Sequence, residues 1–239
     1  MASAKRKAVA VFELGIIPDA LADRWPDYAG MITEWLQPAM PDVDYHAVRI
    51  ARGESVPDVS TFDAYVYSGS RHGVYDDIEW MAPMKQLVRE AASLRLPQFG
   101  ICFGHQLVAE ALGGRVEKSD KGWGCGHQEY ATMGEGTPGD LSVLVMHQDQ
   151  VMAVPRNAEV IGGSDFCENG VIDYQVPART VQFHPEFGHD FVQALLETMG
   201  GQSIPAVVAD AALKTLHVET HSDRVAEWTA DFFRQHGIY

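Results

Sequence analysis

Cysteine is scarce in this sequence. Only Cys102, Cys125 and Cys167 occur among 239 residues. So sparse and odd a set does not build a disulfide framework, and we expect free thiols in a reducing compartment. Basic residues are also few, because 18 Lys and Arg face 33 Asp and Glu, a net charge of −15. Such a surface repels nucleic-acid phosphates and anionic lipids, so nucleic acid is not an expected partner.

Long hydrophobic runs are absent as well. The apolar run at 8–12 stops at Glu13, and no window reaches the roughly eighteen uncharged apolar residues that a membrane-spanning helix needs. We therefore expect no membrane partner and a cytoplasmic location. The sequence also lacks internal repeats, low-complexity blocks and a linker that would mark a domain boundary. Its length and its hydrophobic content of 46% favour one domain with a sizeable core.

Short apolar runs alternate with helix-period segments. The helical pattern over 78–95 stands between two apolar runs, which predicts a βαβ unit and a parallel sheet. The sequence thus predicts one three-layer α/β domain over 1–239 with a central, mostly parallel sheet and a helical extension from about 203 to 239. Predicted strands cover 8–12, 62–69, 96–101, 141–147, 159–164 and 179–184, and further helices cover 103–113, 189–201, 206–216 and 222–236.

One cysteine lies on a cramped corner of this pattern. Gly100 and Gly104 flank Cys102 in "GICFG", the Gly-x-nucleophile-x-Gly form of a nucleophile elbow between a strand and a helix. Glycines suit this turn because it leaves little room for side chains. The positive end of the helix dipole favours a thiolate at the sulfur. The alternative is a buried structural cysteine, which is the commoner fate of a lone cysteine.

A second candidate segment, "VQFHPEF", supplies a base and an orienting group. His184 ends an apolar run, Pro185 turns the chain out of the strand, and Glu186 follows two residues after the histidine. A turn at this point can return the carboxylate to the imidazole. Together with a cysteine on a neighbouring strand of the same sheet, the segment predicts a Cys-His-Glu triad for nucleophilic catalysis.

These segments together resemble a known family. "GICFGHQ" and the distant "VQFHPE" resemble the class I glutamine amidotransferase domain, and "YSGSRHGVYDD" and "MHQDQVMAVPRNAEVIGGS" are similar to its oxyanion loop and to a later stretch. The resemblance covers most of residues 45–190. It is strongest to the glutaminase domain of GMP synthase and to stand-alone relatives such as plant γ-glutamyl peptidases. The resemblance implies a flavodoxin-like α/β fold and a cysteine hydrolase that acts on glutamine or a γ-glutamyl small molecule, with no cofactor and no metal.

The resemblance also implies catalytic roles. Cys102 would attack the γ-carbonyl and form a γ-glutamyl thioester, His184 would protonate the leaving amine and then activate water, and Glu186 would hold the histidine tautomer. Only 55 residues follow His184, too few for the synthetase domain that follows the glutaminase in GMP synthase. We therefore expect ammonia transfer, where it occurs, to need a partner in the form of a separate synthetase subunit.

Oxyanion and substrate-binding roles follow from the same resemblance. The expected oxyanion hole takes N–H groups from Phe103 and from the chain near Gly69 and Ser70. Ser70 departs from the family, which often has a second glycine there, and its Cβ restricts the backbone flip that glycine permits. The residues expected to hold the amino acid end of the substrate are Gln106, Gln148 and Asp149.

The residues leave some alternatives open. Trp123, Cys125 and His127 either line the substrate pocket or serve packing. The residues that follow the oxyanion loop are candidates for selecting the leaving group: Arg71, His72, Tyr75, Asp76 and Asp77. The alternative for Asp76 and Asp77 is that they cap the helix expected near Ile78.

Other functions compete with glutamine hydrolysis. One is a binding or regulatory protein that has lost catalysis, although the three triad positions are all filled. Another is a metal-dependent hydrolase that uses His217 and His221, whose spacing of four places two imidazoles on one helical face. We expect these two to be helix-surface histidines instead.

Overall fold

The computed structural model describes residues 6–239, and within them the chain forms six α-helices and eleven strands. The helices are α1 (Tyr28–Leu36), α2 (Met81–Ser93), α3 (Phe103–Ala111), α4 (His189–Met199), α5 (Ala206–Leu213) and α6 (Ser222–Gln235). The strands are β1 (Lys7–Phe12), β2 (Val43–Val48), β3 (Ala64–Tyr67), β4 (Gln98–Ile101), β5 (Arg115–Lys118), β6 (Gly124–Thr132), β7 (Leu141–His147), β8 (Asp149–Ala153), β9 (Ala158–Gly163), β10 (Val171–Tyr174) and β11 (Ala178–Val181).

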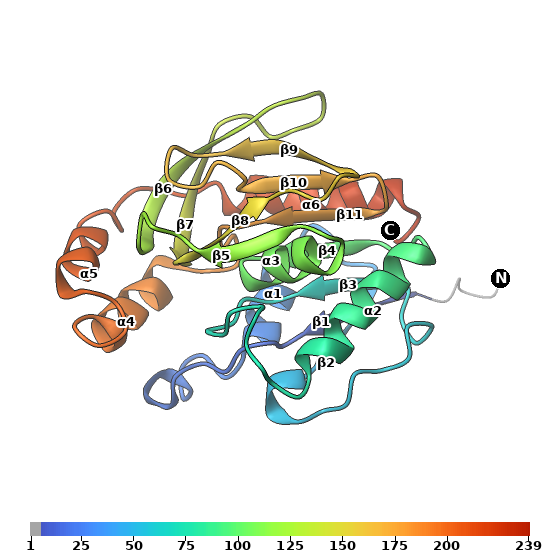
Figure 1. The fold of residues 1–239 in the computed structure, drawn as a ribbon, viewed down its shortest axis with the longest axis horizontal. Helices are drawn as coiled ribbons and strands as arrows, with labels where there is room; N and C mark the ends of the chain where they lie inside the picture. Colours follow the sequence, from blue (N-terminus) through green and yellow to red (C-terminus); the bar gives the residue numbers. More distant parts are fainter. Residues whose placement is uncertain (1–5) are drawn as a thin grey trace.

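Nine of these strands form one mixed sheet in the order β2-β1-β3-β4-β11-β10-β9-β6-β7, drawn in Figure 1. The half from β2 to β11 is parallel, as the βαβ pattern predicts. The half from β11 to β7 is antiparallel. The carboxyl ends of β1, β3, β4 and β11 meet at one edge of the parallel half, and candidate site residues follow three of these strands, β3, β4 and β11.

The parallel half is covered on both faces, which gives the three layers. Alternate residues of β1 belong to different cores: Val9 and Val11 pack with α1 and α6, whereas Ala10 and Phe12 pack with α2 and α3. Because successive side chains of a strand point to opposite faces, a continuous apolar strand serves both cores. The six α-helices therefore divide into α1 and α6 on one face, α2 and α3 on the other, and α4 and α5 beside the antiparallel half.

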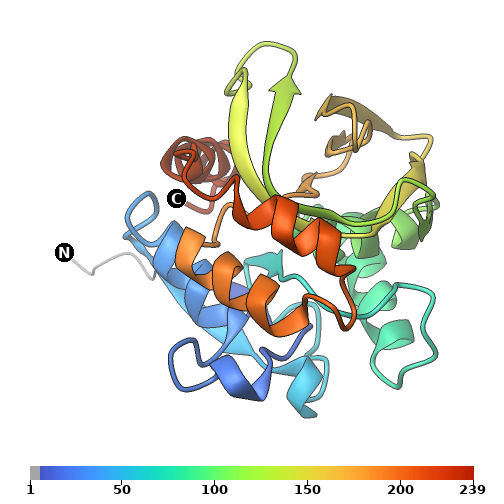
Figure 2. The ribbon, with the colours of Figure 1, turned by 90° about the vertical axis from the view of Figure 1, so that its left-hand side faces the viewer.

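The antiparallel half curls away from the rest of the sheet. Figure 2 shows the β6–β7 hairpin rising from the body of the molecule, with α4 and α5 in front of its base. The glycine-rich segment 133–140 forms the loop of this hairpin. Leu144 of β7 packs with Phe191 and Leu195 of α4 in a third apolar core, so the helices after the catalytic candidates support the hairpin.

Several elements lack a clear signal in the sequence. β6 contains two glycines and four polar residues, and β10 has only two aliphatic residues before Asp173, so neither shows the apolar run that identifies the buried parallel strands. His217 and His221 lie between α5 and α6 rather than on a helix, so their expected placement on a helix surface is wrong. Within residues 6–239 no helix is long and apolar enough to cross a membrane.

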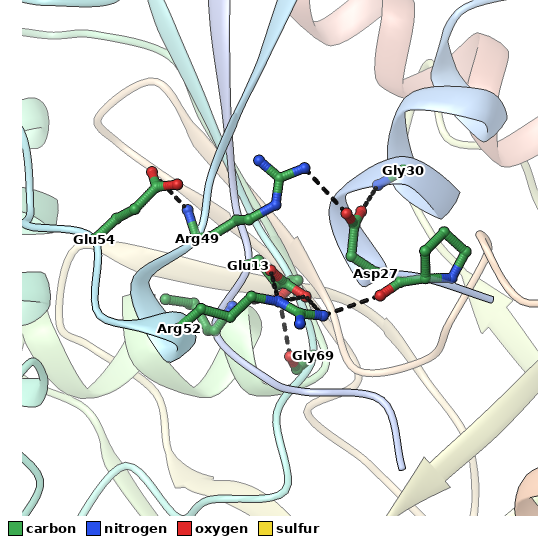
Figure 3. A network of polar contacts seen from close by, with 10 residues as sticks. Glu13, Asp27, Gly30, Arg49, Arg52, Glu54 and Gly69 are labelled. Atoms are coloured by element: carbon green, nitrogen blue, oxygen red, sulfur yellow. Dashed lines mark hydrogen bonds and ion pairs between the residues drawn. The ribbon is translucent and has the colours of Figure 1, made fainter. Parts of the chain in front are cut away.

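A buried carboxylate lies just after β1, near the edge where the site forms. The side chain of Glu13 is fully buried, and both of its oxygens accept hydrogen bonds of 3.0 to 3.2 Å from Arg52. Arg52 also donates to the carbonyl of Pro26 at 2.9 Å. Figure 3 shows this pair beside Arg49 and Asp27 and near the backbone of Gly69. The ion pair thus joins the end of β1 to the chain after β2.

We expect Arg52→Met to lower the free energy of unfolding by about 2 to 3 kcal/mol, because it leaves the Glu13 carboxylate buried without a countercharge. Urea unfolding followed by tryptophan fluorescence measures the effect. The double variant E13Q/R52M removes the orphaned charge and should be more stable than R52M alone. A double variant that is no more stable than R52M would contradict this account.

Candidate active site

Cys102 has the backbone of a strained turn. Its φ is 51° and its ψ is −100°, a region that residues with a Cβ rarely adopt. The surroundings hold it there: its N–H donates to the carbonyl of Val181 on β11 at 2.8 Å, and α3 begins at the next residue. A Cβ on Gly104 would lie 2.3 Å from the Tyr67 carbonyl oxygen. The glycine therefore lets α3 approach β3 and keeps the elbow tight, as the motif predicts.

His184 and Glu186 form a buried pair after β11. The imidazole Nδ1 lies 2.8 Å from Oε1 of Glu186, and the two side chains are 4% and 0% exposed. The N–H of His184 donates to the carbonyl of Leu144 at 2.8 Å, and the ring of Phe187 stacks on the imidazole with centroids 3.9 Å apart. These contacts fix both the position and the plane of the ring.

The imidazole also reaches the cysteine. Burial lowers the pKa of His184, but the charges of Cys102 and Glu186, together with the hydrogen bond to Glu186, outweigh it and raise the pKa to about 10. Negative charge on either side of the ring favours a proton on the imidazole. The structure thus brings the three predicted triad residues together, with His184 between Cys102 and Glu186.

Two backbone N–H groups without hydrogen-bond partners lie near the cysteine and the histidine. Among residues 6–239, neither the N–H of Phe103 nor that of Ser70 has a hydrogen-bond partner. Gly69 lies against the histidine, and a Cβ there would meet Cε1 of His184 at 2.7 Å. The residues expected to form an oxyanion hole therefore surround the cysteine and histidine, with N–H groups free to donate.

A pocket of about 260 Å³ opens above Cys102. All three residues expected to bind substrate line it: Gln106, Gln148 and Asp149. Gln106 donates through Nε2 to the carbonyl of Asp149 at 2.9 Å, which ties α3 to the start of β8. The glutamine thus fixes the backbone of the opposite wall as well as facing the pocket.

The loop after β3 forms another wall of the pocket, and its side chains hold its shape. Asp76 accepts hydrogen bonds from His72 Nδ1 at 3.2 Å and from the N–H of Gly73 at 3.1 Å. Tyr75 reaches across and donates to Asp149 at 2.7 Å. Helix α2 begins only at Met81 and has no side-chain cap. The alternative that Asp76 and Asp77 cap this helix is therefore wrong, and Arg71, His72, Tyr75 and Asp76 line the pocket.

The residues around the start of β6 differ in their surroundings: some line the pocket and others pack in the interior. Trp123 lines the pocket and also packs into the third core. Cys125 packs beside Met146 in that core, and His127 hydrogen-bonds to Ser142 at 2.8 Å. Neither Cys125 nor His127 is among the pocket-lining residues. Both alternatives thus hold for Trp123, and the packing alternative holds for the other two.

Besides Gly73 of the loop after β3, three pocket residues are not identified from the sequence. Lys118 and Met146 line the pocket, and the Met146 carbonyl lies 3.8 Å from the Cys102 sulfur. His147 lines it too, and burial together with the charge of His184 lowers its pKa to about 4, despite a hydrogen bond to Asp149. Only the position of His147 beside Gln148 and Asp149 could have indicated it.

The tail histidines lie elsewhere and have other partners. His217 hydrogen-bonds to the carbonyl of Lys214 at 2.9 Å, and His221 accepts from the N–H of Ser142 at 2.9 Å. No group of three or more metal-ligating side chains is present in residues 6–239. The geometry therefore gives no support to the alternative of a metal site at these two histidines.

Fold and site together define an α/β protein with a cysteine on a strand-to-helix elbow beside a histidine–carboxylate pair. The sequence profile of the class I glutamine amidotransferases matches residues 43–198, more than half of the chain. The chain belongs to this family, in agreement with the resemblance of its motifs.

Individual relatives are more distant. The chain is 27% identical over 193 residues to "Gamma-glutamyl peptidase 4" of Arabidopsis thaliana, which covers 75% of this chain and 76% of the relative. It is 29% identical over 154 residues to one of the subunits of the glutamine-hydrolyzing GMP synthase of Sulfolobus acidocaldarius, covering 60% and 77% of the two chains.

Solved structures share the whole fold at low identity. A glutamine amidotransferase of Thermotoga maritima superposes with a TM-score of 0.75 at 19% identity, covering 97% of this chain and 98% of the other. One from Methylobacillus flagellatus gives a TM-score of 0.74 at 20% identity, covering 98% and 95%. The coverage extends through α5 and α6, which lie beyond the matched family profile.

Proposed function

We propose that the protein hydrolyses the γ-amide bond of glutamine or of a γ-glutamyl compound through a thioester on Cys102. The observation that carries the proposal is the position of Cys102: it lines the pocket on a strained elbow and lies beside the buried, hydrogen-bonded pair of His184 and Glu186. Membership of the class I glutamine amidotransferases supports it.

In the proposed reaction, the Cys102 thiolate attacks the γ-carbonyl carbon, and negative charge develops on the carbonyl oxygen. The N–H groups of Ser70 and Phe103 would stabilise that charge. The carbon–nitrogen bond then breaks as His184 gives its proton to the leaving nitrogen. Water next attacks the thioester while His184 takes a proton from it, and glutamate and the free thiol result.

Glu186 would act on His184 alone. Its Oε1 binds Nδ1, so the other ring nitrogen, Nε2, is left for the cysteine and the leaving group. The second oxygen of the buried carboxylate, Oε2, has no hydrogen-bond partner among residues 6–239. Through the contact with Nδ1, Glu186 raises the pKa of His184 and favours the protonated imidazole, which would supply the proton for the leaving nitrogen.

The same chemistry serves two uses of the leaving group. When ammonia leaves, a separate synthetase subunit would receive it, and the similarity to part of a GMP synthase supports this use. When an amine or a peptide leaves, the protein would act alone as a hydrolase, and the similarity to a γ-glutamyl peptidase supports that use.

Glutamate release from glutamine, γ-glutamylglycine and glutathione tests the proposal, with α-glutamylglycine as the matched control that has the same atoms but no γ-amide bond. We expect release from one or more γ-linked compounds and none from the α-linked isomer. An ammonia donor should release glutamate mainly after a GMP synthetase subunit is added. Release that is equally fast from the α-linked isomer would contradict the proposal.

A further inference from the structure

A buried serine lies directly before the proposed oxyanion loop. Ser68 is fully buried and follows β3, at the edge where the ends of the parallel strands meet. Its hydroxyl oxygen accepts a hydrogen bond of 2.9 Å from the N–H of Leu14, and the same hydroxyl donates to the carbonyl of Gly69 at 2.9 Å. The hydroxyl thus connects the chain after β1 to the loop above Cys102.

The backbone on both sides of Ser68 is fixed as well. The N–H of Ser68 donates to the carbonyl of Phe12 on β1 at 3.1 Å, and its carbonyl accepts from the N–H of Gly104 on α3 at 3.1 Å. A Cβ on Gly15 would lie 2.9 Å from both the Gly69 oxygen and the Ser70 Cα. The chain after β1 therefore packs directly beneath the loop.

These contacts determine which way one peptide group points. The 69–70 peptide is trans, so the carbonyl of Gly69 and the N–H of Ser70 point in opposite directions. The Ser68 hydroxyl holds the Gly69 carbonyl on the side of β1, so the Ser70 N–H faces away from β1. On that side lies the pocket, because Ser70 and Cys102 both line it.

The far end of the loop has a second restraint. The N–H of His72 donates to the hydroxyl of Ser70 at 3.2 Å, so this side chain holds the chain just after the same peptide. The side chain that departs from the two-glycine form of the family thus helps to fix the loop. With both ends held, a reversal of the 69–70 peptide would break the Ser68–Gly69 hydrogen bond.

We propose that Ser68 is a positioning residue for this site: its buried hydroxyl holds the 69–70 peptide so that the Ser70 N–H points at the oxygen of the tetrahedral intermediate. The inference rests on the proposed function, because the oxygen forms only if Cys102 attacks a carbonyl. It predicts that Ser68 affects the transition state rather than the binding of the substrate, since the charge on that oxygen develops only during the reaction.

The test is the kinetics of Ser68→Ala on the best γ-glutamyl substrate of the wild type. We expect kcat to fall roughly a hundredfold, as for a donor displaced by about 1 Å, while KM changes less than about threefold. The rate at which iodoacetamide alkylates Cys102 should stay near that of the wild type, because alkylation forms no oxyanion.

Ser142→Ala is the matched control. Ser142 is also a buried serine with hydrogen bonds to two side chains, His127 and Glu129, but it lies on β7 and outside the pocket. It should lose stability as Ser68→Ala does, without the loss of kcat. Equal kcat values for the two variants, or a rise in KM that accounts for the whole loss, would overturn the inference.

Gly15→Ala provides a second test should Ser68→Ala fail to fold. Its added methyl group would push against Gly69 and Ser70, so it should lower kcat with little change in KM, and an unchanged kcat would overturn the inference. Failure of the proposed function has a different result: the wild type itself would release no glutamate from any γ-linked compound.

Discussion

Replacing Cys102 by alanine is expected to lower the rate of glutamate release at least about a thousandfold, because the variant has no nucleophile to form the thioester. His184→Ala should cost about as much, because an unassisted thiol lacks both the positive charge that stabilises its thiolate and the acid for the leaving nitrogen. His184 lies beside Cys102 and is hydrogen-bonded to Glu186, so the three residues should act as a unit.

If Cys102 and His184 act as a unit, a double variant tests the mechanism more sharply than either single variant. The double variant C102A/H184A should be no slower than the worse of the two single variants, within about threefold, because each substitution already removes the same pathway. If the two residues contributed independently, the fold losses in rate of the two single variants would multiply in the double variant. Cys125→Ala is the matched control, since Cys125 is a thiol outside the pocket-lining set. A Cys102→Ala variant within tenfold of the wild type would exclude the thioester mechanism.

Replacing Gly104 by alanine is expected to have the largest effect on stability. Alanine is favoured over glycine inside a helix by about 1 kcal/mol, so propensity alone predicts a gain. Packing predicts the opposite, because the new Cβ would lie 2.3 Å from the Tyr67 oxygen and 2.7 Å from its Cβ. Backbone of a central strand cannot move aside, and we expect a net loss of about 3 kcal/mol or more.

Urea unfolding measures this loss, or the soluble yield where the variant does not fold. Gly30→Ala is the matched control, since Gly30 is also a helical glycine and its added Cβ would meet a side chain, Asp27 at 3.1 Å, rather than the backbone of a strand. It should remain within about 1 kcal/mol of the wild type. A Gly104→Ala protein as stable as Gly30→Ala would show that α3 does not need its close approach to β3.

The parts of the site that the sequence predicts share one property: their function constrains the local backbone. The elbow needs glycines beside Cys102, and His184 stands between a buried strand and a proline. Such constraints act over a few residues and are therefore visible in a short segment. The central parallel strands β1, β3, β4 and β11 are equally visible, because burial on both faces requires continuous apolar runs, whereas the edge strand β2 is half polar and gives no such signal.

Other features carry no local signal. The antiparallel strands β6 and β10 have mixed residues, since their pairing partners rather than their own propensities stabilise them. Asp76 follows the pattern of a helix cap, yet the helix begins five residues later and the carboxylate holds the loop instead. The contact from Tyr75 to Asp149 joins positions 74 residues apart, and the sequence between them does not indicate it.

The sequence by itself determined the family, the central parallel strands of the sheet, and the identity of the cysteine, histidine and glutamate proposed as the triad. Only the tertiary structure decided that these three side chains touch, which residues surround them, and that Ser68 lies beneath the oxyanion loop. The reason is physical. The backbone conformation of a short segment depends mainly on residues that are neighbours along the chain. The edge of a sheet instead brings together strands that are far apart in the sequence, and no single segment indicates which other segments will lie beside it.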